Sequence, residues 1–129
     1  MFTIEQIRNA HDQVKSGTDF PEYIQKIKKI GVISFVTWVK DSHTEYFGEN
    51  DFTIQSSGMY DEKLISEVSN KLKFSEFLKE HQLGNTDYFQ FCNDCAETGI
   101  EKWIVDLQEF TCKYYDRQGN EILKEVIPN

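Results

Sequence analysis

Residues 19–47 read DFPEYIQKIKKIGVISFVTWVKDSHTEYF, and residues 87–115 read DYFQFCNDCAETGIEKWIVDLQEFTCKYY. The two stretches match without a gap at a shift of 68 positions, which aligns Gly31 with Gly99. The apolar positions between them also agree in kind. Similarity at a fixed spacing is a signature of structural repetition. We therefore expect the chain to contain two copies of one structural unit.

The repeat also predicts how the chain is divided. Repeat one covers about residues 1–58 and repeat two about residues 69–129, and both lie in a single domain of residues 1–129. No low-complexity or proline-rich linker separates them. We therefore expect the two copies to pack together rather than move independently.

Each copy changes its hydrophobic period partway along. In the first copy, Tyr23, Ile24 and Ile27 recur at helical spacing until Gly31 ends the helix. From Val32 the apolar residues alternate, which predicts a strand. The same signals predict helices over about 4–15, 19–30, 71–83 and 87–98, and a connector with a short helix within 59–68. They predict strands over about 32–39, 44–47, 52–55, 100–108, 111–115 and 121–127.

This order of elements predicts an α+β fold, an internally duplicated (ααβββ) unit with helices packed on antiparallel sheet. The pattern leaves open whether the six strands form one sheet or two. One strand face, formed by Val32, Ser34, Val36 and Trp38, is unusually apolar. We expect something to cover this face rather than leave it exposed to water.

The composition restricts the class of partner. The 129 residues carry a formal net charge of −8 and no basic cluster, so nucleic acid and a membrane surface are not expected partners. The first residues include Glu5 and no long apolar run, which is unlike a signal peptide or a spanning helix. Three cysteines suit a reducing compartment. We expect a cytoplasmic protein.

Cys92 and Cys95 form a Cys-x-x-Cys pattern, which redox enzymes and zinc sites both use. The repeat places Ile24 and Ile27 at the matching positions of the first copy. We therefore interpret the two cysteines as small buried hydrophobic residues, and we expect no metal and no cofactor.

The three histidines fall into two groups. The first helices of the two copies also match if two residues are dropped from the loop, and His11 then falls on His81. Both lie beside the apolar stripes, which favours a structural role. His43 lies in a polar hairpin with Asp41 and Tyr46, and an imidazole near a carboxylate and a phenol could transfer protons. The alternative is that Asp41 builds the turn and His43 only occupies it.

The strands supply further candidate ligand-binding residues. The repeat pairs Trp38 with Asp106 and Tyr46 with Tyr114, so unlike groups stand at like positions in the first pair. Divergence of this kind can mark a function added to one copy, or an interface with a second subunit. The hairpin register is not fixed by the sequence, so it is open whether Trp38, His43 and Tyr46 share a face.

The chain resembles the YbcV-like family of small bacterial proteins, a domain of unknown function with some members labelled phage envelope protein. The resemblance rests on strings along nearly the whole chain: FTIEQI (2–7), SGTDFP (16–21), HT (43–44), YFG (46–48), TIQS (53–56), EKWIVDL (101–107) and CKYYD (112–116). It implies no catalytic residue and no cofactor. The phage label suggests only a prophage neighbourhood.

Three functional hypotheses follow. The first is a non-enzymatic cytoplasmic binding or interaction protein that forms a homodimer through its apolar strand face. The second is a small-molecule-binding protein or an acid–base enzyme with its site around Asp41, His43 and Tyr46. The third, which rests on the resemblance alone, is a structural virion protein.

Overall fold

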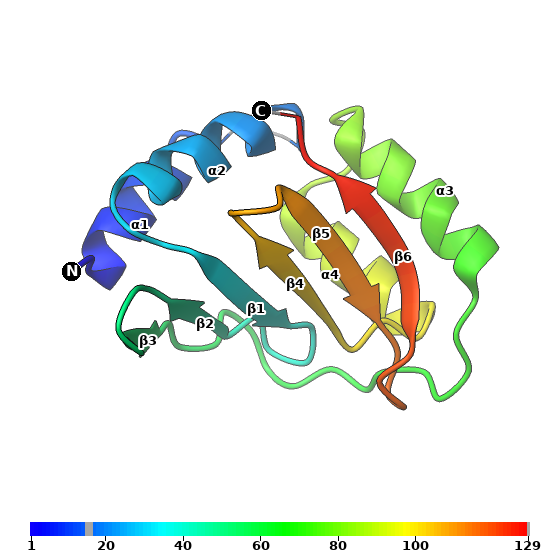
Figure 1. The fold of residues 1–129 in the computed structure, drawn as a ribbon. Helices are drawn as coiled ribbons and strands as arrows, with labels where there is room; N and C mark the ends of the chain where they lie inside the picture. Colours follow the sequence, from blue (N-terminus) through cyan, green and yellow to red (C-terminus); the bar gives the residue numbers. More distant parts are fainter. Residues whose placement is uncertain (15–16, 129) are drawn as a thin grey trace.

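The computed structural model describes residues 1–14 and 17–128, which contain four α-helices, one short 3-10 helix and six strands. All six strands form one antiparallel sheet in the order β3-β2-β1-β4-β5-β6 (Figure 1). The predicted α+β class is confirmed, and the strands form one sheet rather than two. The elements are α1 (Ile4–His11), η1 (Gly17–Asp19), α2 (Phe20–Lys29), β1 (Ser34–Trp38), β2 (Thr44–Phe47), β3 (Thr53–Gln55), α3 (Lys71–Gln82), α4 (Tyr88–Glu97), β4 (Lys102–Asp106), β5 (Thr111–Tyr115) and β6 (Glu121–Val126).

The two halves of the sheet meet at β1 and β4, which pair with Val36 opposite Ile104. These two residues are also matched by the shift of 68 positions. A direct pairing of matched residues is what a two-fold axis between β1 and β4 requires. The duplication of the unit stays a prediction, but the order of the strands and this register agree with it.

Side-chain caps begin three of the helices. Thr3 and Gln6 form a capping box at α1, Asn70 accepts from the Lys73 N–H at α3, and Asp87 accepts from the Gln90 N–H at α4. Helix α1 ends at His11, earlier than predicted, and Lys15 lies outside the described residues. No helix in the described ranges is long and apolar enough to cross a membrane.

The predicted short helix within 59–68 is wrong. This segment is instead an irregular strap whose backbone N–H groups bond to other elements: Met59 to the Asp41 carbonyl at 2.7 Å, and Lys63 to the Lys40 carbonyl at 2.7 Å. These donors satisfy elsewhere the bonds that a helix would make within itself. Leu64 is 96% exposed, so the apolar residues that suggested a helix do not form a buried stripe.

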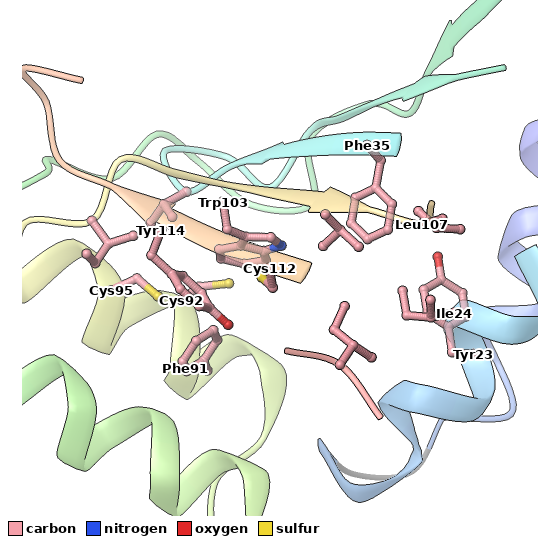
Figure 2. Close-up of a cluster of buried hydrophobic side chains, with 14 of the residues drawn as sticks. Tyr23, Ile24, Phe35, Phe91, Cys92, Cys95, Trp103, Leu107, Cys112 and Tyr114 are labelled. Carbon is pink, nitrogen blue, oxygen red and sulfur yellow. The ribbon is translucent and has the colours of Figure 1, made fainter. Parts of the chain in front are cut away.

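The core lies on one face of the sheet, which we call the covered face, beneath the helices (Figure 2). Residues of β1 and β4 alternate between buried and partly exposed, as expected for strands with one face in a core. Figure 2 shows side chains of α2 and α4 converging on this face. The core includes Tyr23, Ile24, Ile27, Phe35, Tyr46, Phe74, Leu78, Phe91, Cys92, Cys95, Trp103, Val105, Cys112 and Tyr114.

The opposite face of the sheet, which we call the open face, carries rings and aliphatic side chains that are only partly buried. They are Val36, Trp38, Phe47, Ile104 and Tyr115, and none belongs to the core cluster. Among the described residues no element of the chain covers this face, and its cover by a second molecule stays a prediction. Val32 was also assigned to this face, but it is 1% exposed because it precedes β1, where its N–H bonds to Ile27.

Candidate functional site

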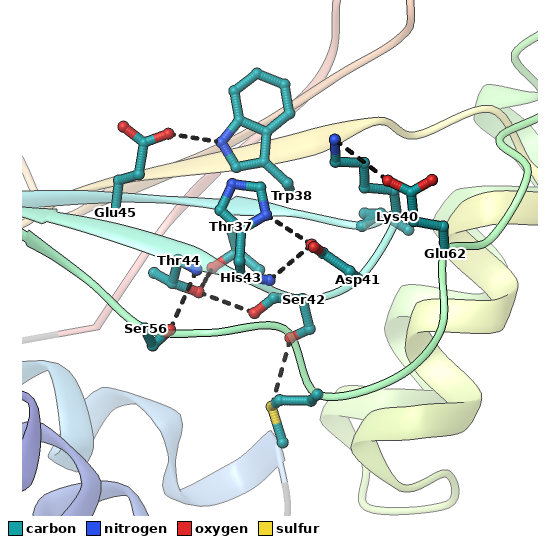
Figure 3. Close-up of polar contacts among 12 residues, drawn as sticks. Thr37, Trp38, Lys40, Asp41, Ser42, His43, Thr44, Glu45, Ser56 and Glu62 are labelled. Carbon is teal, nitrogen blue, oxygen red and sulfur yellow. Dashed lines mark hydrogen bonds and ion pairs between the residues drawn. The ribbon is translucent and has the colours of Figure 1, made fainter.

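Three of the residues predicted as a site meet at the end of the β1–β2 hairpin, on the rim of the open face (Figure 3). Nδ1 of His43 lies 2.6 Å from Oδ1 of Asp41, which also accepts from the His43 backbone N–H at 2.9 Å. The His43 ring stacks on Trp38 with centroids 6.0 Å apart, and Trp38 donates to Glu45 at 3.1 Å. Asp41, His43 and Trp38 thus form one cluster.

The Asp41 carboxyl is tuned by opposing effects. Partial burial acts to raise its pKa, but the hydrogen bonds from the backbone and ring of His43, together with the Coulombic effects of His43 and Lys40, outweigh burial and lower the pKa. The same bonds close the turn, in which Ser42 has a φ of 68°. This cluster therefore stabilises the conformation of the hairpin turn, which agrees with the alternative hypothesis that Asp41 builds the turn.

The other three predicted residues lie elsewhere. Tyr46 is on the covered face, where its ring centroid is 5.5 Å from that of Phe35. Asp106 stands at the far end of β4, opposite Ser34, and accepts from the backbone N–H groups of the next turn. Tyr114 is on the covered face of β5. The six predicted residues therefore do not converge on one site.

A groove with a volume of about 480 Å³ lies on the covered face. Its floor is formed by strands β4 to β6, and its walls come from the helices and from the chain end after β6. The volume falls within the usual range for small-molecule sites. The lining residues are His11, Val14, Thr18, Phe20, Pro21, Leu78, His81, Gln82, Thr86, Asp87, Tyr88, Phe91, Trp103, Cys112, Tyr114, Glu125, Val126, Ile127 and Pro128.

Aromatic rings dominate one side of the groove. Phe91 lies 5.7 Å from Trp103, which lies 6.2 Å from Tyr114 and 6.3 Å from Tyr88, measured between ring centroids. Figure 2 shows the first three of these rings together, with Tyr23 of α2 on the other side of the view. Phe91, Trp103 and Tyr114 are themselves buried, so they give the groove an apolar wall through the small parts of their rings that other side chains leave uncovered.

His81 provides a hydrogen-bond acceptor in this lining. Its Nδ1 lies 3.1 Å from the Thr86 carbonyl oxygen and 3.3 Å from the Thr86 hydroxyl. The carbonyl can only accept, so the neutral tautomer that donates to it from Nδ1 leaves Nε2 as an acceptor. The ring stacks on Phe91 with centroids 4.5 Å apart. Burial lowers the pKa of His81, which outweighs the opposing effect of the Thr86 carbonyl, and this favours the neutral ring at pH 7.

Glu125 is a second acceptor. Both of its carboxylate oxygens accept from Nε2 of Gln82, at 2.9 and 2.8 Å, and the Tyr114 hydroxyl donates to it at 3.4 Å. Asp87 also lines the groove. Among the described residues no lysine or arginine does. The charged groups of the lining are therefore carboxylates, which disfavour an anionic ligand.

The cysteines are buried, as the interpretation of Cys92 and Cys95 predicted. Cys112 is the one in the groove lining, and burial raises its pKa to about 12. A thiol of this kind stays protonated and is a poor nucleophile. In the described part of the chain, no group of three or more His, Cys, Asp or Glu residues is placed to hold a metal ion.

The sequence contained one signal for this groove. His11 and His81 occupy matching positions, and both line the groove, from α1 and α3. His11 reaches the rings of Tyr23 and Tyr88, with centroids 5.2 and 6.4 Å away. The predicted structural role of this pair rests on their position beside apolar helix stripes. Such a stripe does not show whether it borders a groove.

The fold and groove define a small α+β protein with one open sheet face and a ligand-sized groove under its helices. By sequence, the chain belongs to the DUF1398 family, described as proteins of unknown function, whose model matches residues 8–126. It is also similar to the uncharacterized protein YcgX of Escherichia coli strain K12, with 18% identity over 118 residues. That match covers 92% of this chain and 88% of YcgX.

Proposed function

We propose that this protein binds a small molecule in the groove on the covered face. The observation that carries the proposal is the lining itself: a ligand-sized space bordered by four neighbouring rings, with a few polar groups at defined places. Sites for small molecules combine a mostly apolar wall with a few polar groups that orient the ligand.

The polar groups suggest the class of ligand. Neutral His81 offers an acceptor at Nε2, and Glu125 offers carboxylate oxygens. The best complement is an uncharged or cationic molecule with a flat apolar body and one hydrogen-bond donor. A carboxylate or phosphate ligand would meet Asp87 and Glu125 without a described cation to balance it.

Catalysis at the β1–β2 hairpin has less support. Asp41 and His43 bond to each other, but Tyr46 lies on the covered face, so the three groups do not surround one reacting centre. We therefore keep the hypothesis of a non-enzymatic binding protein, and we place its binding site in the groove rather than at the β1–β2 hairpin. The narrower YbcV-like resemblance and the prophage link stay predictions, and nothing in the groove depends on them.

Tryptophan fluorescence tests the proposal, because Trp103 lines the groove and Trp38 lies on the open face. In a Trp38→Phe background, emission reports Trp103 alone. Naphthalene, naphthol and naphthoate share one ring system and differ only in their polar group. We expect saturable quenching in the order naphthol, naphthalene, naphthoate. Absence of saturable binding by all three would overturn the proposal.

A second variant tests the role of His81. His81→Phe keeps a ring against Phe91 and removes the acceptor. Loss of one hydrogen bond is expected to weaken naphthol binding by about threefold to tenfold. Naphthalene, which has no donor, serves as the matched control and should bind as before. Equal loss for both compounds would show that the variant had disturbed the groove itself.

A further inference from the structure

The open face carries a row of side chains whose charge changes across the sheet. The side chains on this face are fixed by the strand registers, which align one row across all six strands: Gln55, Glu45, Val36, Ile104, Lys113 and Lys124. The centre of the row is aliphatic, one side is acidic and the other side is basic. The charge along this row therefore changes from acidic on the β2 side to basic on the β5–β6 side.

Among the described residues the basic side of this row is only weakly compensated, although Asp106 and Glu109 line the same part of the face. Lys113 and Lys124 are direct cross-strand partners, an arrangement that is unfavourable for like charges. The ion pair that Lys113 makes is a long one, 3.9 Å to Glu121. On the other side Glu45 accepts a hydrogen bond from Trp38, which leaves it able to accept further donors. Both sides are suited to an opposite charge from outside.

We propose that two chains pack open face to open face about a two-fold axis that runs parallel to β1 and β4. This rotation exchanges the two sides of the sheet. It places Glu45 over Lys113 of the second copy, Val36 over Ile104, and Trp38 over Lys102. Stacked sheets lie about 10 Å apart, so the aliphatic pair meets at the centre while long charged side chains bridge its flanks.

The charge pattern also selects this orientation over the alternative. A two-fold axis perpendicular to the strands would place Glu45 over Glu45 and Lys113 over Lys113. Like charges brought together at an interface cost several kcal/mol. The axis parallel to the strands avoids every such contact in the row and makes the interface isologous, as in most homodimers.

The shape of the face supports the same arrangement. A hollow of about 300 Å³ lies on the β4–β6 side, lined by Ile104, Asp106, Glu109, Thr111, Lys113, Tyr115 and Lys124. The proposed rotation carries β2 of the second copy over β5, so Phe47 faces Thr111 and Glu45 faces Lys113. A partly exposed ring would therefore fill the hollow that an isolated chain leaves open.

Sedimentation equilibrium of the full chain, with charge-reversal variants, tests the proposal. We expect a dimer in the micromolar range, and each of Glu45→Lys and Lys113→Glu should weaken dimerisation by about 100-fold, because each puts like charges face to face twice. The double variant restores opposite charges and should recover dimerisation to near the wild-type level. This recovery also shows that the single variants are not simply misfolded.

Matched controls lie on α3, away from the open face. Glu76→Lys and Lys71→Glu make the same changes in net charge at exposed helix positions and should leave the dimer intact. A wild-type monomer at these concentrations would overturn the proposal. So would a dimer that survives both single variants, or a double variant that stays as weak as the singles. Naphthol binding in the groove is independent of all these outcomes.

Discussion

Rings on the two faces of the sheet have different neighbours. On the covered face, Phe74 is fully buried and lies 4.9 Å from Tyr114 and 6.2 Å from Phe91 between centroids. On the open face, Trp38 is held by the His43 ring, the Glu45 carboxylate and the Lys102 ammonium, which lies 4.9 Å from its ring centroid. Apolar packing fixes the rings on the covered face, whereas polar contacts fix Trp38 on the open face.

This difference indicates where the stability of the fold resides and where the surface remains available. Burial of apolar area is the main favourable contribution to folding, and it is concentrated on the covered face. Polar contacts between exposed groups contribute little each. The open face can therefore change with small effect on stability, whereas the covered face cannot.

The most direct test of the comparison applies one substitution to both faces. Phe74→Ala leaves a cavity in the core and should lower the free energy of unfolding by about 3–5 kcal/mol. Phe47→Ala removes a ring that is already partly exposed and should cost about 1 kcal/mol. Urea unfolding at protein concentrations below the dimer range measures both. Similar losses for the two variants would mean that the open face is buried in the isolated protein, against the structure.

A smaller effect is expected at Gly99, where α4 leads into β4 beneath the strap. Its φ is +84°, and a Cβ atom would lie 2.7 Å from the Ser69 Cα. Gly119 has the same φ with nothing within 4 Å. Gly119→Ala should therefore cost only the conformational strain of about 1 kcal/mol, and Gly99→Ala about 3 kcal/mol because the strap must also move. Thermal unfolding compares the pair, and equal costs would contradict the close approach.

The sequence predicted best what depends on local signals. The bounds of β2 and β5 came out as predicted, and the helices predicted to begin at about residues 71 and 87 begin at Lys71 and Tyr88. Alternation over four or five residues identifies a strand, and an oxygen-bearing side chain before an apolar stripe identifies a helix start. The helix prediction for residues 59–68 was wrong because the backbone of this segment makes hydrogen bonds to residues distant in the sequence, which outweigh its weak helical pattern.

The candidate site could not be predicted to the same extent, because it depends on packing between distant segments. Alternation placed Trp38 and Tyr46 on strands but did not say which face of each strand is covered. The register puts them on opposite faces. His11 and His81 reach one groove only because α1 and α3 both lie over the covered face. The sequence showed that the two histidines occupy matching positions, but it did not show the groove between them.

The smallest predicted effect concerns Asp41 at the rim of the open face. His43→Phe keeps a ring against Trp38 and the backbone N–H of residue 43, and it removes the hydrogen bond from Nδ1 together with the Coulombic effect of the imidazole. The pKa of Asp41 is lowered in the folded protein, so this variant should raise it toward the ordinary value of 3.8. Carbon-13 NMR titration of the Asp41 carboxyl measures the change directly.

The stability of the hairpin should follow the same titration. Because the folded protein favours the ionised carboxylate, the contribution of Asp41 is fully present above pH 3.8 and is lost as the pH falls through the lower, folded pKa. The wild type and His43→Phe should therefore differ most in unfolding free energy near neutral pH and converge in acid. An unchanged Asp41 pKa in the variant would assign the shift to the backbone N–H of residue 43 and to Lys40. The His43 ring would then only pack on Trp38, and the polar contacts of the open face would be weaker than the comparison of the two faces implies.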